Sequence, residues 1–239
     1  MARFRSRSAY QLKYPYPRRQ FIRGLLRGGI RFASSLLLKY KVEGLENLPE
    51  QGPLLLVGNH FHFLDTISPI HTTPYALEFI GDAVMPNAPG YLRFFPSLWG
   101  TLQILQGTPN LEAMRAAEAV LSQKGVLAIF PEGHVHKPPL GKPLPGASYL
   151  ALRSGAPIVP IATFSEDNWD ILGTLRRERR RARVIARIGK AFGPLSAGTD
   201  EVPGRTEIRA AGEEIIQQIA RLLPPQAGGT YGLPDVAGV

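Results

Sequence analysis

Two histidines and an aspartate lie close together in the segment GNHFHFLD, which directly follows the apolar run LLLV. A histidine beside an aspartate can act as a general base, because the carboxylate orients the ring and stabilises the imidazolium that forms. The pair His60-x-His62 could instead bind a metal ion. On a regular helix Asp65 would share a face with His62, whereas His60 reaches Asp65 only if the chain turns from strand into helix between them. Spacing alone leaves both interpretations open.

A second polar cluster, PEGHVH, follows the apolar run VLAIF. In open α/β sheets ligands bind beyond the carboxyl ends of the strands, where both clusters are expected. If the two strands are neighbours, five polar side chains converge on one cleft: Asn59, His60, Asp65, Glu132 and His134. A tight turn after a buried strand would explain the proline and glycine of the second cluster, but not an exposed glutamate between them.

Apolar runs of strand length alternate with helical patterns along most of the chain. Four short, continuously apolar runs predict buried strands over residues 53–59, 125–130, 156–163 and 183–189. Helices are predicted over residues 206–223 and after Asn110, a suitable N-cap, as far as Gly125. This order predicts an α/β fold, a single domain with a mostly parallel or mixed sheet covered by helices.

Composition narrows the class of protein. The chain has 239 residues, 44% of them hydrophobic, enough for one full core. It has no cysteine, which excludes a thiolate metal site and a cysteine nucleophile. No apolar run reaches the length of a spanning helix, so none is expected. The formal net charge of +9, mostly from arginine, favours anionic partners.

The arginine-rich run at residues 176–183 raises the possibility of nucleic acid. However, no stacking aromatics are interleaved with these arginines, and no helix-turn-helix or zinc module is visible. Nucleic acid is therefore not an expected partner. A solvated loop or a second lipid-facing patch accounts better for this run.

Residues 18–38 predict an amphipathic helix. Arginines recur at every fourth position, and apolar residues recur at helical spacing on the other side. The arginine ridge consists of Arg19, Arg23, Arg27 and Arg31. The alternatives are an ordinary core-packed helix with a solvated basic face and a helix that binds anionic lipid, which would stabilise the repelling arginines. We favour the second, with residues 1–40 as a basic segment at a membrane interface and residues 41–232 as the main domain.

Three ordered motifs resemble those of the glycerolipid acyltransferase family, the group of 1-acylglycerol-3-phosphate acyltransferases. They are Asn59 followed by His60-x4-Asp65, then FPEG, and then IVPI at residues 158–161. The similarity extends from about residue 40 to residue 232. The resemblance implies that His60 is the general base and Asp65 its partner. It also implies a binding site for the acceptor, to which we assign Asn59, Phe130, Pro131, Glu132, Gly133 and His134.

The resemblance further implies direct acyl transfer without a covalent acyl-enzyme. Neutral His60 would take the proton of an acceptor hydroxyl as the oxygen attacks a thioester carbonyl, while Asp65 fixes the tautomer. The donor would be acyl-CoA or acyl carrier protein, used as substrate, and the acceptor a lysophospholipid such as 1-acylglycerol-3-phosphate. No cofactor or metal is expected. The expected location is peripheral, on a phospholipid membrane surface at the cytoplasmic face of the cell membrane.

Three departures from the family pattern concern the acceptor. His62 replaces a small polar residue, His134-Val135-His136 replaces Thr-Arg-Ser after FPEG, and Gln106 stands at the position of a phosphate-binding arginine. A phosphate would then need other cations, or the acceptor carries a different head group. The candidate cations are His134, His136, Lys137 and Lys142.

Two other functions remain open from the sequence. The pairs His60-x-His62 and His134-x-His136 could bind zinc or two metal ions in a metal-dependent hydrolase. A non-catalytic lipid-binding protein that keeps the fold is the third possibility. The intact His60 and Asp65 favour the acyltransferase over both.

Overall fold

The computed structural model describes residues 11–85, 88, 90, 92–104, 111–167, 169–195 and 202–232. Seven strands form one sheet in the order β1-β7-β6-β2-β5-β3-β4. Their bounds are β1 (Leu38–Glu43), β2 (Leu54–Gly58), β3 (Leu77–Gly81), β4 (Leu102–Gln103), β5 (Val126–Ile129), β6 (Ile158–Ser165) and β7 (Ala182–Ile188). The pair β6–β7 is antiparallel and the other neighbours are parallel, so the sheet is mixed. The predicted α/β fold and its four buried strands are confirmed.

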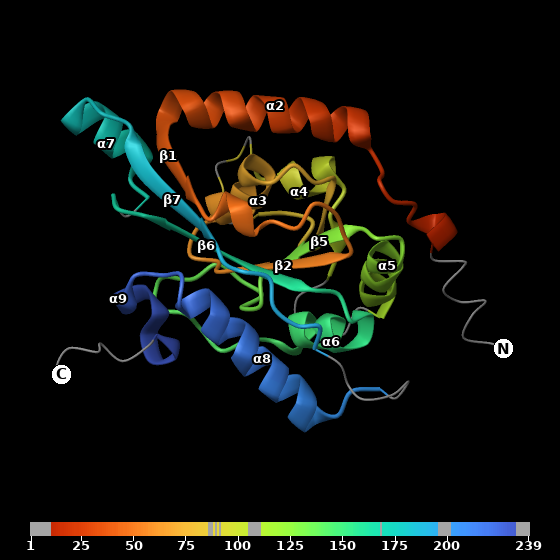
Figure 1. Ribbon diagram of the computed structural model, residues 1–239. Coiled ribbons are helices and arrows are strands. Elements are labelled where there is room, and N and C mark those ends of the chain that lie inside the picture. Colours follow the sequence, from red (N-terminus) through yellow and green to blue (C-terminus); the bar gives the residue numbers. More distant parts are fainter. Residues whose placement is uncertain are drawn as a thin grey trace, which may run out of the picture.

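Helices cover both faces of the sheet (Figure 1). One face carries α2 (Gln20–Leu37), α3 (Ile67–Thr72) and α4 (Phe95–Trp99), and the opposite face carries α5 (Leu111–Ser122), α6 (Pro145–Ser154) and α8 (Arg205–Ala220). The remaining helices are α7 (Ile171–Glu178) and α9 (Pro225–Gly228), with short 3-10 turns η1 (Leu45–Asn47), η2 (Phe63–Thr66) and η3 (Gly229–Tyr231). The two helices predicted after the first strand are therefore present as α5 and α8. The predicted N-cap Asn110 lies outside the described residues.

The continuous apolar runs arise because the central strands are covered on both faces. In β2, Leu55 and Val57 pack into the core beneath α5, α6 and α8. Leu54 and Leu56 point to the other face and join the core that includes Ile70 of α3 and Trp99 of α4. Every residue of β2 is buried. This central strand therefore holds the polar segment that follows it in a fixed position.

A buried ion pair fixes α2 to the sheet. Glu78 lies in β3 with none of its surface exposed. Arg23 of α2 donates from Nη1 to Glu78 Oε1 at 2.6 Å and from Nη2 to Oε2 at 2.8 Å. Arg18 adds a bond from Nη2 to Oε2 at 2.7 Å, and Arg23 Nε donates to the Trp99 carbonyl at 3.0 Å. Burying a carboxylate away from water is costly unless charged donors bind it, and here the donors come from α2 and the residues before it. This network therefore holds the N-terminal helix against β3 and α4.

The predicted outward orientation of the arginine ridge is wrong. Arg23 is buried, Arg19 donates to carbonyls of α4, and Arg27 donates to the carbonyls of Pro74 and Tyr75. Of the four ridge arginines, Arg31 alone keeps an exposed position without a hydrogen bond to the described part of the protein. Helical spacing separates two faces but does not say which one is inside. Here the carboxylate of Glu78 and nearby backbone carbonyls bind the arginine face. The exposed stripe of α2 is apolar: Phe21 (79% exposed), Leu25 (64%), Phe32 (72%) and Leu36 (63%).

The chain continues from α2 into the sheet without a linker, because β1 begins at Leu38 and pairs in parallel with β7. The division expected at residue 40 stays a prediction. Among the helices of the described residues, none is both long and apolar enough to cross a bilayer.

Replacing Arg23 by methionine should lower the free energy of unfolding by about 3 kcal/mol, because Glu78 would stay buried with Arg18 as its one remaining charged partner. The double variant Arg23→Met, Glu78→Leu should recover most of that loss, since no buried carboxylate remains. Urea unfolding followed by circular dichroism measures both. Arg31→Met is the matched control on the same helix. An equal loss for Arg23→Met and Arg31→Met would contradict the buried ion pair.

Candidate active site

The two polar clusters predicted from the sequence meet at one edge of the sheet. β2 and β5 are parallel neighbours, with Val57 opposite Ile129, so the residues that follow them leave the sheet side by side. The ring of His60 stacks on Phe130, with the ring centroids 4.5 Å apart. His136 N donates to the His60 carbonyl at 3.0 Å. The expected convergence of the two motifs is therefore confirmed.

Glu132 joins the motifs from a buried position. One of its oxygens, Oε2, accepts from the backbone N–H of His60 at 2.8 Å. The other, Oε1, accepts from the N–H of Gly141 at 2.7 Å and lies 2.5 Å from His136 Nε2. Glu132 is 1% exposed, which corrects the expectation of an exposed glutamate that contacts the acceptor. Since both oxygens are used, Glu132 positions the His60 backbone instead.

The chain turns sharply between His60 and Asp65, as a His–Asp pairing requires. After β2 ends, residues 63–66 form the 3-10 turn η2. Asp65 caps this turn with Oδ2, which accepts from the N–H of Phe61 at 2.5 Å and of His62 at 2.8 Å. These bonds fold the segment back on itself. His60 and Asp65 thereby belong to one compact turn at the end of β2.

One atom of each proposed catalytic residue has no hydrogen-bond partner among the described residues: His60 Nδ1 and Asp65 Oδ1, both buried. A buried polar atom left unpaired costs about 1–3 kcal/mol. One atom belongs to an imidazole and the other to a carboxylate, so each is chemically suited to be the partner of the other. Two buried and unpaired polar atoms of complementary type thus lie on residues of the same turn.

Burial controls the protonation of this pair. Burial is the main cause that lowers the pKa of His60 to about 4; a backbone hydrogen bond to His62 opposes the change, and the neighbouring histidines add a smaller lowering effect. Burial also raises the pKa of Asp65 well above its usual value, against the effect of the N–H bonds from His62 and Phe61. His60 is therefore neutral at neutral pH, the state that a general base requires.

His62 points away from the base. Its Nδ1 accepts from the N–H of Leu64 at 3.3 Å, which caps η2. Its ring stacks nearly parallel on Trp169, with centroids 4.8 Å apart and an angle of 6°. Trp169 lies between β6 and α7, and no motif in the sequence indicated it. His62 therefore has a structural place that explains its presence without a role in proton transfer.

Asn59 belongs to the frame of the site. It is 1% exposed, and its amide exchanges two hydrogen bonds with the backbone of Thr163, at 2.8 and 2.7 Å. The hydroxyl of Thr163 contacts Ser68 at 2.8 Å, and Tyr40 donates to the same Ser68 oxygen at 2.8 Å. This corrects the assignment of Asn59 to acceptor binding. Tyr40, Ser68 and Thr163 were missed because they are single polar residues in three separate segments.

The rest of the FPEG segment forms a turn with one open side. Pro131 is buried and its carbonyl accepts from the N–H of Leu144 at 2.7 Å. Gly133 has φ +72°, and a Cβ there would lie 2.3 Å from a Leu144 methyl carbon. His134 is exposed beside it, so it is free to meet an acceptor. Gln106, the residue at the missing arginine position, lies outside the described residues.

His136 is engaged on both ring nitrogens. Nε2 faces the carboxylate of Glu132, and Nδ1 lies 2.8 Å from the carbonyl oxygen of Lys137. Both ring nitrogens of His136 are therefore occupied by contacts within the protein. Of the two histidines after FPEG, His134 is the one that can turn toward a phosphate.

The four histidines of the hydrolase alternative do not form one ligand set. The ring of His62 lies against Trp169, and that of His136 is held by Glu132. In the part of the chain that the structure describes, no three histidine, aspartate or glutamate side chains are grouped as a metal site would require. The geometry therefore gives this alternative no support.

The comparisons with known proteins agree with this arrangement. The sequence profile of the Acyltransferase family matches residues 39–163, more than half of the chain, and includes both motifs of the site. The chain belongs to the acyltransferase family, and the protein is an acyltransferase. The comparison with curated proteins finds no significant match.

A solved structure shares the fold. It is the 1-acyl-sn-glycerophosphate (LPA) acyltransferase PlsC from Thermotoga maritima, to which this chain is similar with a TM-score of 0.51 and 21% sequence identity. The match covers 87% of this chain and 84% of that one. At this identity the likeness shows the fold. It extends beyond the segment that the family profile covers.

The depressed pKa of His60 makes stability depend on pH. Above pH 6.5, the usual pKa of histidine, the ring of His60 is neutral in both the folded and the unfolded chain. Between pH 6.5 and its pKa in the folded chain, about 4, only the unfolded chain binds the proton. The free energy of unfolding should therefore fall as pH decreases through this window, by up to about 1.4 kcal/mol per pH unit from His60. Urea unfolding across the window measures this slope. His60→Gln should reduce the slope, the exposed control His134→Gln should not, and equal slopes would contradict the assignment.

Proposed function

We propose that this acyltransferase moves a fatty acyl group from a thioester to a hydroxyl of a lysolipid, with His60 as general base and Asp65 as its partner. The observation that carries the proposal is the pair of buried, unpartnered atoms in one turn, His60 Nδ1 and Asp65 Oδ1. The family membership supports the acyl transfer itself. The similar fold of an LPA acyltransferase supports a lysophospholipid acceptor.

In the proposed reaction His60 accepts the proton of the acceptor hydroxyl while that oxygen attacks the thioester carbonyl carbon. The carbonyl π electrons move to oxygen to give a tetrahedral intermediate. When these electrons return, the C–S bond breaks, and the thiolate takes the proton from the imidazolium. The products are an ester and a free thiol, so atoms and charges balance without a cofactor. Asp65 stabilises the imidazolium between the two steps.

Glu132 has an indirect role in the proposed reaction. Its bond to the N–H of His60 fixes the backbone from which the catalytic ring projects, and Phe130 limits the ring by stacking. A ring held in place before substrate arrives needs less ordering in the transition state. We therefore assign Glu132 and Phe130 as positioning residues of the base.

The lipid substrates and the exposed apolar stripe of α2 support a contact with a phospholipid membrane. Large apolar side chains with more than half of their surface exposed cover this face of the helix. No aspartate or glutamate precedes Glu43, so the segment does not repel an anionic leaflet. The basic surface would equally suit the acidic acyl carrier protein as donor, besides acyl-CoA. A position on the cytoplasmic face of the cell membrane is part of this proposal.

His60→Ala should reduce acyl transfer from acyl-CoA by a factor of about 10² to 10⁴, the usual contribution of a general base. His62→Ala should keep a substantial fraction, because His62 caps η2 and stacks on Trp169. Release of free CoA with a lysophospholipid acceptor measures the rate, and mass spectrometry identifies the product. Complete loss in both variants, with stoichiometric zinc in the wild-type protein, would favour the hydrolase.

The acceptor's head group is tested by replacing His134. With lysophosphatidic acid as acceptor, the exposed ring of His134 beside Gly133 can donate a hydrogen bond to a phosphate oxygen. His134→Ala should then raise KM about 10-fold, the value of one charge-assisted hydrogen bond. Alternatively, an acceptor without this phosphate is preferred.

The control for this test is 1-acylglycerol, which has the hydroxyl but no phosphate, and His134→Ala should leave its KM unchanged. A protein that uses lysophosphatidic acid best, with no effect of His134→Ala on its KM, would contradict the prediction. Lys137 and Lys142 would then be the residues to replace.

A further inference from the structure

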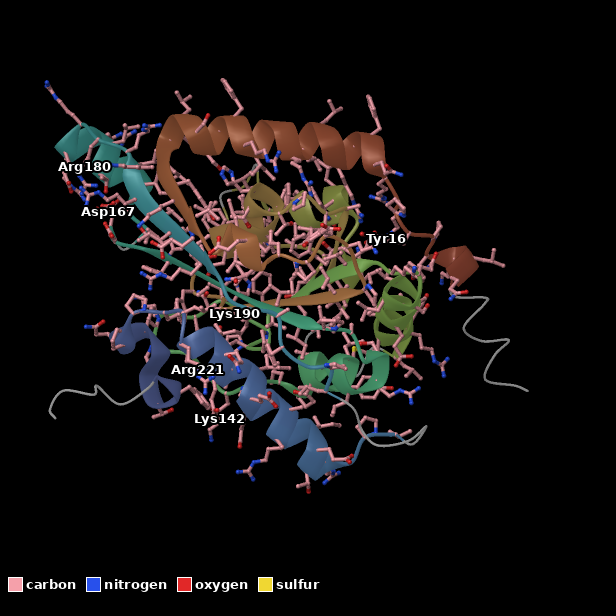
Figure 2. The ribbon with its side chains drawn as sticks, viewed as in Figure 1. Tyr16, Lys142, Asp167, Arg180, Lys190 and Arg221 are labelled. Atoms are coloured by element: carbon pink, nitrogen blue, oxygen red, sulfur yellow. The ribbon has the colours of Figure 1, made fainter. Side chains whose placement is uncertain are left out.

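The arginine-rich run at residues 176–183 is not a loop. Its first part belongs to the helix α7, and its last part begins β7. Four of its six arginines have partners: Arg177 with Asp170, Arg180 with Asp167, Arg183 with Glu166, and Arg181 with the carbonyl of Ser35. Figure 2 shows Arg180 beside Asp167 under α7. Three of the six arginines are therefore balanced by acidic side chains of the protein, and a fourth is held by a carbonyl.

Arg176 and Arg179 differ from these four. Both are exposed, and neither forms an ion pair with an acidic residue in the described part of the chain. Arg176 shares one face of α7 with Leu172 and Leu175, because the three positions follow the spacing i, i+3, i+4. Arg179 is the C-cap residue directly after the helix. Leu172 is 59% exposed and Leu175 37%. This outer face of α7, together with the C-cap, therefore combines exposed leucines with exposed arginines.

The inner face of α7 explains why the outer face is left open. Thr174 is 2% exposed, and Ile171 packs against the small core of Leu38, Ala182 and Val184. These contacts fix the rotation of the helix about its axis. The orientation of the helix is therefore fixed, and the same outer face is always exposed.

The helix α7 lies next to the end of α2. Arg181 Nη1 donates to the Ser35 carbonyl at 2.6 Å, and the first residues of the following strands, Leu38 and Ala182, pair in register. Figure 1 shows both helices at the same side of the molecule, away from α8. At this junction the apolar stripe of α2 ends with Phe32 and Leu36, which are 72% and 63% exposed. The exposed leucines of α7 and the exposed apolar stripe of α2 therefore belong to helices that lie at the same side of the molecule.

We infer that α7 forms a second contact with an anionic bilayer: Leu172 and Leu175 enter the interface beside α2, and Arg176 and Arg179 bind lipid phosphates. This inference extends the membrane contact proposed above for α2. A bilayer fits the composition of the face, since exposed leucines and unpaired arginines match acyl chains and anionic head groups. Two contacts in different directions would fix the orientation of the protein on the membrane, whereas one helix would let it roll about the helix axis.

The chain has no cysteine, which allows a direct test. Single cysteines are placed at Leu172 in α7, at Leu36 in α2 as a positive control, and at Val202, 67% exposed before α8, as a negative control. Each is labelled with an environment-sensitive fluorophore. On addition of vesicles of phosphatidylcholine and phosphatidylglycerol, the labels at positions 172 and 36 should shift to shorter emission wavelength, and the label at 202 should not.

A second measurement tests the charges. Arg176→Gln with Arg179→Gln should weaken binding to the anionic vesicles by about 10- to 30-fold in co-sedimentation. The matched control removes two charges from the opposite side of the molecule, with Arg205→Gln and Arg221→Gln on and beside α8 (Figure 2). It should change binding by less than about twofold, since charges far from the surface are screened. Thermal unfolding confirms that each variant is folded.

A shift at position 36 without one at position 172, or equal binding of the two double variants, would overturn the inference. A shift at 172 that grows with protein concentration in the absence of vesicles would also overturn it, in favour of a second copy of this chain as the partner. Binding is measured without an acyl donor. Failure of the proposed acyl transfer would therefore leave this result unaffected, and an active enzyme could still contradict it.

Discussion

The site depends on the hydrogen bonds that the buried carboxylate of Glu132 accepts. A carboxylate taken out of water is costly unless its oxygens accept hydrogen bonds, and the available donors come from separate parts of the chain. They are the N–H of His60 after β2, the N–H of Gly141 and the ring of His136. Satisfying one charge thus requires the segment after β2 and the loop after β5 to come together. The same bonds fix the backbone that carries the proposed base.

The protein has a second buried carboxylate, and the contrast between the two is informative. Glu78 is paired with Arg23 and Arg18, whose guanidinium groups match its shape and neutralise its charge. Glu132 is held by neutral N–H groups and by His136 instead. Guanidinium pairs give a fixed attachment for α2 on β3, the strand next to the edge strand β4. At the carboxyl ends of β2 and β5, backbone donors hold Glu132 without placing a permanent arginine charge beside His60, whose neutral form is the one that can accept a proton.

Much of the fold could be predicted because the signals were local. Continuous apolar runs gave the central strands, since β2 is buried on both faces, and helical spacing gave α2, α5 and α8. The convergence of the two motifs could also be predicted, because the carboxyl ends of parallel neighbouring strands meet at one edge. These rules depend on residues close together in the sequence. The strands, the helices and the meeting of the two motifs could therefore be predicted with little knowledge of distant contacts.

The predictions that were wrong depend on contacts between segments that are distant in the sequence. Which face of α2 is inside depends on Glu78, a buried residue in β3 that has no signature in the helix itself. The burial of Glu132 and the use of the Asn59 amide by Thr163 depend in the same way on distant segments. The run at residues 176–183 looked like a solvated loop because its acidic partners lie outside it, at Asp167 and Glu166. In each case a polar group was expected to face solvent or a ligand, and a distant segment of the protein provides its partner instead.

The electrostatics of the His–Asp turn indicate when the pair would stabilise the reaction. Burial lowers the pKa of His60 and raises that of Asp65, so an isolated charge on either residue is unfavourable in this turn. Opposite charges on both residues attract strongly in the same low-dielectric setting. In the proposed reaction the imidazolium would form only as the acceptor hydroxyl loses its proton, and so this attraction would be gained in the transition state and not in the free enzyme. An interaction with that timing accelerates the chemical step, because the ground state does not share in it.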